Sequence, residues 1–316
     1  MTHGIVSPDH TGELEYSAVS LPIGALSEDH SAVVGAGGHL FLVGGSNGLI
    51  RQYAEPTEAD QIASLRAKVL VWSTLTESRD SRARAAGAEY VQICIPDKSS
   101  SLDSRVAGLG PVTPLLRDVD RELADAPFYV SGRSALAEAS QDSRSVNDLW
   151  LRGDSHLGPR GAAVEARALI SALTDASFMD DVRFSPSGVF LGDLGARFFG
   201  RPIPEPDLVP ASPWLEKVAQ GRVLQSEHRP ESGHTGRMLH WVTPQAPIDA
   251  KVLVFGNSFF SGGDHPRGLN FWISRAFKEH RFVWSAEMLD EVISEQRPDV
   301  IICQTVERFM TSVPPA

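Results

Sequence analysis

Residues 251–263 read KVLVFGNSFFSGG, an apolar run that ends in a turn of small residues. Val252 to Phe255 are β-branched, aliphatic or aromatic, a composition typical of a strand that is buried on both faces. The run stops at Gly256-Asn257-Ser258. Open α/β sheets keep their ligands outside the carboxyl ends of their strands, so Ser258 is predicted to lie at a functional edge. We interpret Ser258 as a nucleophile.

The chain beyond this strand alternates between helix and strand patterns. We expect a helix near residues 269–278 and a strand at 281–285, then a helix near 287–296 and a strand at 300–303. This β-α-β-α-β order predicts parallel strands joined by right-handed crossovers.

The N-terminal half continues the same alternation. A long amphipathic helix is expected over 57–86 and ends at Gly87, and a strand is expected at 89–95. Further helices are expected over 113–125 and 162–173. The predicted fold is therefore α/β, a three-layer α/β/α arrangement around a mainly parallel sheet.

Two segments depart from this pattern. Residues 1–36 show no sustained period, and we expect an N-terminal arm that precedes a single domain at 37–316. Residues from about 180 to 250 are irregular and rich in proline, with two strand-like runs at 222–229 and 236–243. We expect an insertion that carries a β-hairpin and lies near the site.

Composition narrows the class of protein. The chain has 316 residues and a formal net charge of −11, and it contains no long basic run, so we do not expect nucleic acid as a partner. No stretch reaches the ~18 apolar residues of a membrane span, and no export signal is recognisable. We expect a cytoplasmic location. The two cysteines, Cys94 and Cys303, lie in apolar runs and are expected to be buried free thiols.

A base and an orienting carboxylate stand two residues apart in Asp154-Ser155-His156, just before a predicted helix. In an extended segment, alternate side chains point to the same side, so the carboxylate can reach one ring nitrogen while the other faces a serine. By itself this pattern also fits a surface loop in which Asp154 caps the helix, and Gly256-Asn257-Ser258 also fits a plain turn. A third element, QTVER at 304–308, follows another predicted strand.

Taken together, these pieces resemble the SGNH-hydrolase superfamily, and within it the alginate O-acetyltransferase-like branch. In that branch the D-x-H pair precedes the G-x-S block, as it does here, whereas ordinary SGNH hydrolases have the reverse order. The matching pieces are HLFLVGGSNGLIRQY, EYVQICIPDKSS, GDSHLGPRGA, GDL at 192–194, VLVFGNSF and RPDVIICQTVER.

The resemblance implies a catalytic triad in which Ser258 is the nucleophile, His156 the base and Asp154 the orienter. QTVER lies where the superfamily places an oxyanion-hole Asn block, which makes Gln304 and Arg308 candidates for that role. The backbone N–H groups of Ser258 and its neighbour are the alternative donors.

Further candidates for oxyanion or substrate binding surround these residues. Asn257 and Phe259 flank the serine, and Phe259 fits either a sugar-binding cleft or the core. Lys98 follows a strand end, where it could bind an anionic group or extend into solvent. His234, His240 and His265 match no familiar metal signature together with Asp154, so we expect no metal.

The expected function is a serine-dependent O-acyltransferase that acts on a sugar, a glycoside or a similar hydroxylated acceptor. No bound cofactor is expected. The acyl donor would be a thioester such as acetyl-CoA, an ester or an acyl-donor protein. Two alternatives stay open, an esterase or deacylase with the same triad and a non-catalytic glycan-binding protein on the same scaffold.

Overall fold

The structure is a computed structural model. It describes residues 21–45, 48–142, 149–199, 204–260 and 263–315.

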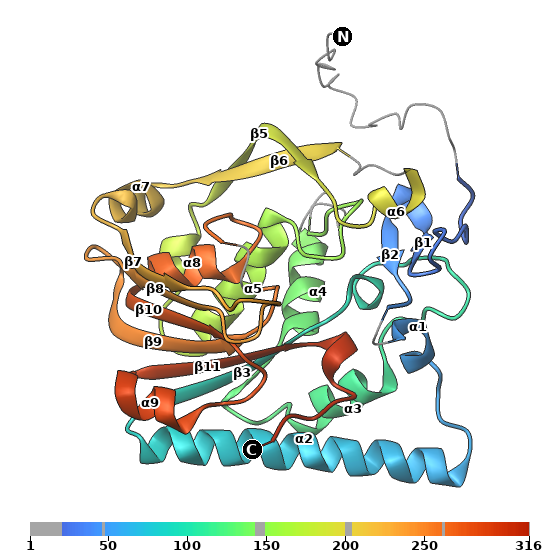
Figure 1. The fold of residues 1–316 in the computed structure, drawn as a ribbon, viewed down its shortest axis with the longest axis horizontal. Helices are drawn as coiled ribbons and strands as arrows, with labels where there is room; N and C mark the ends of the chain where they lie inside the picture. The colour runs from blue at the N-terminus through green and yellow to red at the C-terminus, as the bar shows by residue number, and fades with distance from the viewer. Residues whose placement is uncertain (1–20, 46–47, 143–148, 200–203, 261–262, 316) are drawn as a thin grey trace.

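A seven-stranded sheet forms the centre of the molecule, in the order β4-β3-β11-β9-β10-β8-β7 (Figure 1). Five neighbouring strands are parallel, and β8 and β7 continue the sheet in antiparallel pairing. The strand bounds are β3 Glu89–Ile95, β4 Tyr129–Ser131, β7 Val223–His228, β8 Met238–Val242, β9 Ile248–Gly256, β10 Phe277–Trp284 and β11 Val300–Val306.

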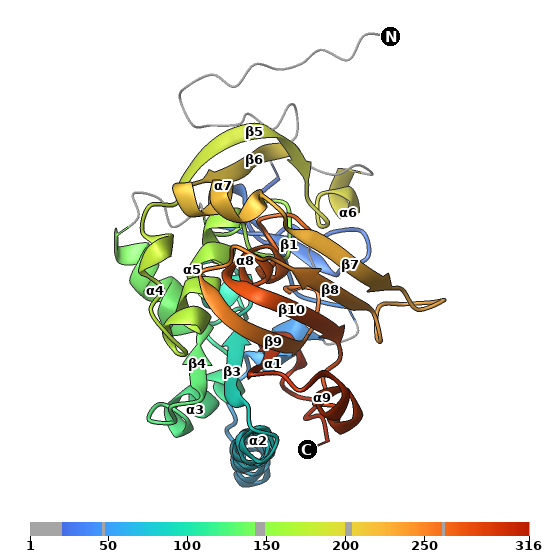
Figure 2. The same ribbon diagram turned by 90° about the vertical axis from the view of Figure 1, so that its left-hand side faces the viewer.

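Helices cover both faces of this sheet (Figures 1 and 2). The helices on one face are α2 (Ala59–Ala85), α3 (Pro114–Glu122) and α9 (Asp290–Gln296), and those on the other are α4 (Gly132–Asp142), α5 (Pro159–Ser171) and α8 (Leu269–Ala276). Alternate residues of β9 serve the two faces. Val252 and Val254 pack with α5 and α8, whereas Leu253 and Phe255 pack with α2 and α9. The expected three-layer α/β/α fold is confirmed.

The strand predicted at the start of the stretch 251–263 is present as β9. β9 is buried from Val252 to Gly256 and pairs with β10 on one side and β11 on the other. β10 begins at Phe277, four residues before the expected 281, because α8 ends at Ala276 and the chain turns directly into the sheet. The helix α4 was not predicted.

The described residues of the insertion form two antiparallel strand pairs. The predicted pair β7 and β8 forms and extends the edge of the central sheet. The unpredicted pair is β5 (Arg183–Leu191) with β6 (Pro204–Ala211), a separate antiparallel sheet that lies over the top of the domain (Figure 2). Three prolines stand in β6, which edge strands tolerate because one side of the backbone needs no ladder partner.

The described part of the expected arm belongs to the domain. β1 (Ala32–Val34) pairs with β2 (Leu40–Leu42), and Val33 lies in the main core, so the ordered domain begins before residue 37. The short helices α1 (Leu49–Gln52), α6 (Ala196–Phe199) and α7 (Pro213–Ala219) complete the fold.

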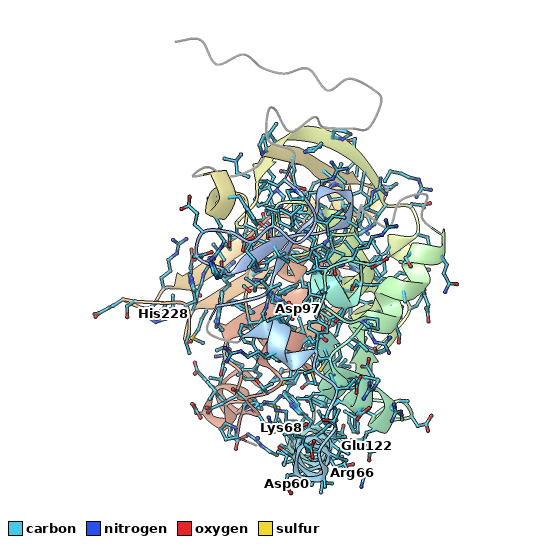
Figure 3. The ribbon with its side chains drawn as sticks, turned by 90° about the vertical axis from the view of Figure 1, so that its right-hand side faces the viewer. Asp60, Arg66, Lys68, Asp97, Glu122 and His228 are labelled. Carbon is cyan, nitrogen blue, oxygen red and sulfur yellow. The ribbon has the colours of Figure 1, made fainter. Side chains whose placement is uncertain are left out.

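Two further findings concern the cysteines and the apolar character of the helices. Cys94 and Cys303 are buried free thiols, as predicted. Among the described residues, no helix has both the length and the apolar character that crossing a membrane requires. Figure 3 shows Asp97 inside the molecule near the carboxyl end of β3, while His228 projects from the end of β7.

Candidate active site

The turn after β9 is held by side chains on both sides. The Asn257 N–H donates to Gln304 Oε1 at 3.0 Å, and Asn257 Oδ1 accepts the Phe259 N–H at 3.2 Å. A Cβ on Gly256 would lie 3.0 Å from Gln304 Oε1, closer than almost all real contacts of this kind. Glycine is therefore suited to this position, where β9 and the Gln304 side chain approach each other closely. The turn leaves Ser258 partly exposed at the carboxyl edge of the sheet.

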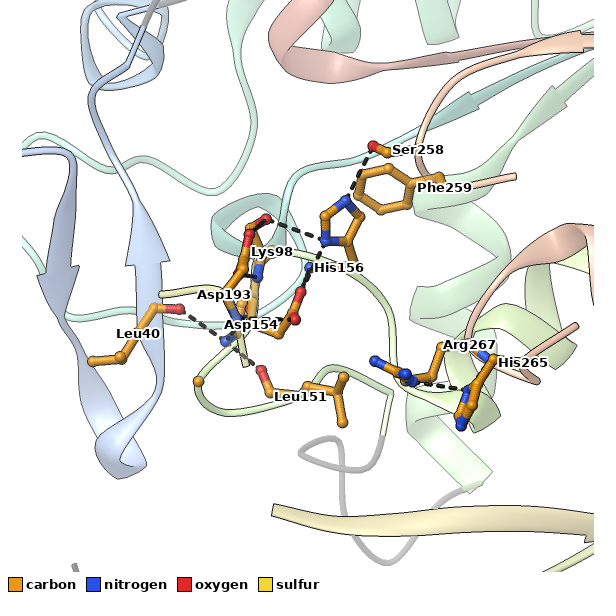
Figure 4. Close-up of polar contacts among 12 residues, drawn as sticks. Leu40, Lys98, Leu151, Asp154, His156, Asp193, Ser258, Phe259, His265 and Arg267 are labelled. Carbon is orange, nitrogen blue, oxygen red and sulfur yellow. Dashed lines mark hydrogen bonds and ion pairs between the residues drawn. The ribbon is translucent and has the colours of Figure 1, made fainter. Parts of the chain in front are cut away.

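Ser258, His156 and Asp154 lie within hydrogen-bond distance in the predicted order (Figure 4). His156 Nε2 is 3.0 Å from Ser258 Oγ, and His156 Nδ1 is 2.8 Å from Asp154 Oδ1. The imidazole is 33% exposed and can meet a ligand from solvent, while Asp154 is buried. With Nδ1 protonated and Nε2 free, His156 can accept the serine proton.

Hydrogen bonds keep Asp154 ionised. Burial alone would raise the pKa of this carboxyl, but the ring, charge and backbone N–H of His156 and the backbone N–H of Asp193 lower the pKa to about 2. A carboxylate that stays charged can stabilise the imidazolium that forms during proton transfer.

Asp193 is a part of the site that sequence reasoning did not single out. Its N–H donates to Asp154 Oδ2 at 3.2 Å, and its carboxylate accepts the N–H and Oγ–H of Ser155 at 2.7 and 2.8 Å. The preceding Gly192 permits this approach, since a Cβ there would lie 2.2 Å from Gly153 O. The signal was present in the GDL piece of the resemblance, but no role had been attached to it.

Lys98 is buried behind the triad. It is 3% exposed, and its Nζ lies within hydrogen-bond distance of four backbone carbonyl oxygens, one in β2 and three in residues 151–154. Burial lowers the pKa of Lys98 to about 7, while the charges of Glu205 and Asp154 act in the opposite direction. Lys98 therefore has no free ammonium for a substrate, and it does not extend into solvent.

Phe259 packs against the ring of His156, and Arg308 packs against Phe259. Phe259 is 2% exposed, and its ring centroid lies 5.0 Å from that of His156. The Arg308 guanidinium lies 5.3 Å from the Phe259 centroid and pairs with Asp97 at 3.2 Å. Both side chains are buried, so they form the floor of the site.

Two donors at the nucleophile turn remain for a ligand. Within the described part of the chain, neither the N–H of Ser258 nor Gln304 Nε2 has a hydrogen-bond partner, and Gln304 Nε2 is buried beside the turn. The Phe259 N–H is already bound to Asn257 Oδ1. Of the predicted oxyanion donors, the Ser258 amide thus has free capacity, Gln304 has a free but buried Nε2, and Arg308 uses Nη1 to pair with Asp97.

A second polar cluster lies to the side of the triad (Figure 4). The Arg267 Nε donates to His265 Nδ1 at 2.9 Å, and His265 Nε2 lies 2.8 Å from Asp207 in β6. The Arg267 guanidinium stacks on Phe190 of β5, 3.2 Å from the ring centroid. The β5–β6 sheet therefore fixes the position of a cation beside the site.

The histidines considered as metal ligands have other partners. His265 pairs with Asp207, and His240 lies 3.1 Å from Glu279. In the described ranges, the group of His, Cys, Asp and Glu side chains close enough to share a metal is Asp154, His156 and Asp193. Asp154 and His156 already bind each other directly, and Asp193 binds Asp154 through its backbone.

Comparisons with known proteins identify the fold. The O-acetyltransferase domain of AlgJ from Pseudomonas putida superposes with a TM-score of 0.55 at 16% identity, over 89% of this chain and 92% of that one. A DHHW family protein from Eubacterium siraeum gives 0.53 at 15% identity, over 93% and 96%. PatB1 from Bacillus cereus with a sulfonyl adduct gives 0.53 at 10% identity, over 78% and 88%.

No protein-family model matches the chain, and no curated protein sequence matches it. At these identities the structural likeness establishes the fold alone, a three-layer α/β/α domain like the O-acetyltransferase domain of AlgJ, in agreement with the fold that the sequence resemblance implies.

Proposed function

We propose that the protein is a serine-dependent O-acyltransferase that moves an acetyl or similar acyl group to a hydroxyl of a sugar, a glycoside or a related acceptor. The observation that carries this proposal is the 3.0 Å contact between His156 Nε2 and Ser258 Oγ. A second contact, 2.8 Å between His156 Nδ1 and Asp154 Oδ1, completes the chain of hydrogen bonds. A serine hydroxyl becomes a useful nucleophile when a base stands within this reach.

In the first half-reaction, Ser258 Oγ bonds to the acyl carbon of the donor as its proton moves to His156 Nε2. The bond between the acyl carbon and the donor sulfur or oxygen then breaks, and His156 protonates the leaving group. The Ser258 amide, which has no partner among the described residues, is proposed to stabilise the negative oxygen of the tetrahedral intermediate, with the buried Gln304 Nε2 as a second candidate donor.

In the second half-reaction, the acceptor hydroxyl attacks the acyl-serine while His156 takes its proton. Collapse of the intermediate releases the acylated product, and the proton returns to Ser258 Oγ. An acyl thioester such as acetyl-CoA, an ester or an acyl-donor protein would supply the group. The likeness to the O-acetyltransferase domain of AlgJ supports transfer as the outcome.

Hydrolysis is the second candidate, because water can replace the acceptor at the same acyl-serine. The exposed face of His156 favours this alternative, since it lets water approach the base. A non-catalytic glycan-binding role is the weakest, because the triad atoms are already at hydrogen-bond distance.

The test compares wild type with Ser258→Ala, using 4-nitrophenyl acetate as donor and a panel of sugars as acceptors. Nitrophenol release measures formation of the acyl-serine, and mass spectrometry of the acceptors separates transfer from hydrolysis. We expect Ser258→Ala to fold and to lose both activities. Full activity in the folded variant would refute the proposed role of Ser258.

A further inference from the structure

The segment that carries the triad base is buried yet lies outside the named strands. Leu151 and Asp154 are 6% and 4% exposed, and residues 151–154 belong to no strand or helix. Buried peptide groups need hydrogen-bond partners, which a neighbouring strand normally supplies. Here two ionic side chains from distant parts of the chain supply most of them.

The cation acts on the carbonyls of this segment. Lys98 Nζ lies 2.5 Å from Leu151 O, 2.8 Å from Arg152 O, 3.2 Å from Asp154 O and 2.8 Å from Leu40 O (Figure 4). An ammonium group has three hydrogens and no acceptor capacity, so the four surrounding carbonyls share its three donors. Lys98 stands three residues after the end of β3, which keeps its backbone close to the central sheet.

The anion acts on the amides of the same segment. Glu205 in β6 is 7% exposed, and its two carboxylate oxygens accept the N–H groups of Arg152 and Gly153. Charged hydrogen bonds of this kind are stronger than neutral ones. Successive peptide groups of one loop are thus held by a carboxylate from the insertion and an ammonium from the sheet.

We propose that Lys98 and Glu205 are paired positioning residues, which hold the backbone of 151–154 and thereby fix Asp154 and His156 relative to Ser258. The kinetic part of this inference rests on the proposed acyl transfer. Neither residue is placed to contact substrate, because both are buried and their polar atoms are occupied by the loop. Their effect therefore passes through the position of the triad.

The two charges depend on each other. Removal of Glu205 leaves Lys98 with the charges of Asp154 and Asp193, whereas removal of Lys98 takes away the cation that acts on Glu205; in both cases the remaining buried charge is less well compensated. The single variants Lys98→Met and Glu205→Gln should each disturb the loop, and the double variant should be less damaging than the product of the two single effects.

The kinetic test uses the full chain with 4-nitrophenyl acetate. Each single variant is expected to lower kcat by about 10- to 100-fold with little change in KM, because displacement of a base by about 1 Å has effects of this size. Lys278→Met and Glu138→Gln are the matched controls, since Lys278 pairs with Asp249 at the surface and Glu138 is exposed on α4. Both controls should retain wild-type kinetics.

A spectroscopic test is independent of activity. The low-field proton resonance of His156 Nδ1–H, assigned by its absence in His156→Gln, reports the hydrogen bond to Asp154. We expect this resonance to shift or broaden in Lys98→Met and Glu205→Gln but not in the controls. If Lys98→Met does not fold, Glu205→Gln decides the question, since its remaining oxygen keeps one of the two backbone contacts.

Folded variants with wild-type kcat and an unshifted resonance would overturn the positioning role. Strictly multiplicative effects in the double variant would overturn the pairing of the two charges. If the wild type transfers no acyl group from any donor, the proposed function fails, while the His156 resonance still tests the positioning of the triad.

Discussion

Replacement of Asp154 by Asn separates the charge of the orienting group from its shape. The carboxylate accepts from the His156 ring, the His156 N–H and the Asp193 N–H, and these contacts lower its pKa from 3.8 to about 2. At about 1.36 kcal/mol per unit, the shift corresponds to roughly 2.4 kcal/mol of favourable interaction with the charged form. The amide has one acceptor oxygen, so Asp154→Asn should lose most of this stabilisation.

The same change should affect catalysis more strongly than folding. Loss of the orienting charge from a Ser-His-Asp triad costs about 10⁴ in kcat, because the imidazole is no longer held in the productive tautomer. We expect a fall of about 10³ to 10⁴ in the rate of nitrophenol release and a loss of roughly 2 kcal/mol in the free energy of unfolding measured with urea.

The pH dependence of the stability difference gives a further check. A depressed carboxyl pKa contributes stability that is complete above the ordinary value of 3.8 and is lost as the pH falls through about 2. The contribution of the Asp154 carboxyl to the difference between wild type and Asp154→Asn should therefore be complete above about pH 5 and should shrink below about pH 4. A folded variant with near wild-type kcat would refute the orienting role.

Three other changes test neighbouring features. Gly192→Ala should lower kcat and reduce the free energy of unfolding in urea by about 1–3 kcal/mol, because its Cβ would lie 2.2 Å from Gly153 O. Unchanged values would mean that the backbones at Gly192 and Gly153 can separate without cost. Asp193→Ala should cost about 1–3 kcal/mol of unfolding free energy by removing both acceptors of Ser155, and Asp193→Asn should restore part of it. Burial raises the pKa of Glu165, whose oxygens have no hydrogen-bond partner among the described residues, so wild-type stability should fall as pH rises above about 4.5. Glu165→Gln should remove that slope, and parallel urea midpoints across pH for both proteins would contradict this.

The parallel core of the fold could be predicted because its signals are local. The run at Glu89–Ile95 is mostly apolar and follows a helix pattern, and the structure places β3 at those residues, after α2 ends at Ala85. The β5–β6 sheet could not be predicted in this way. Pro204, Pro206 and Pro210 argue against a strand, and β6 forms because it pairs with β5 on one side and lies outside the central sheet.

The triad residues could be proposed from the sequence because their spacing and order carry the signal. The supporting residues have no such pattern. Glu205 is one acidic residue in a proline-rich run, and its contact with Gly153 spans 52 residues. The place of Lys98 after a strand makes it a candidate to bind an anionic group or to extend into solvent, and only the fold shows that four carbonyls surround it. Interactions of this kind depend on tertiary contacts that no local pattern encodes.

The separation of the site residues along the chain bears on how the protein folds. His156 and Ser258 are 102 residues apart, and the loop before His156 is anchored by Lys98 from one direction and Glu205 from the other. Closing such loops costs entropy, and contacts of long sequence separation form slowly. Helices and the local hairpins can form without them. Recovery of enzymatic activity after dilution from denaturant should therefore lag behind recovery of helical circular dichroism, and so report completion of the native state.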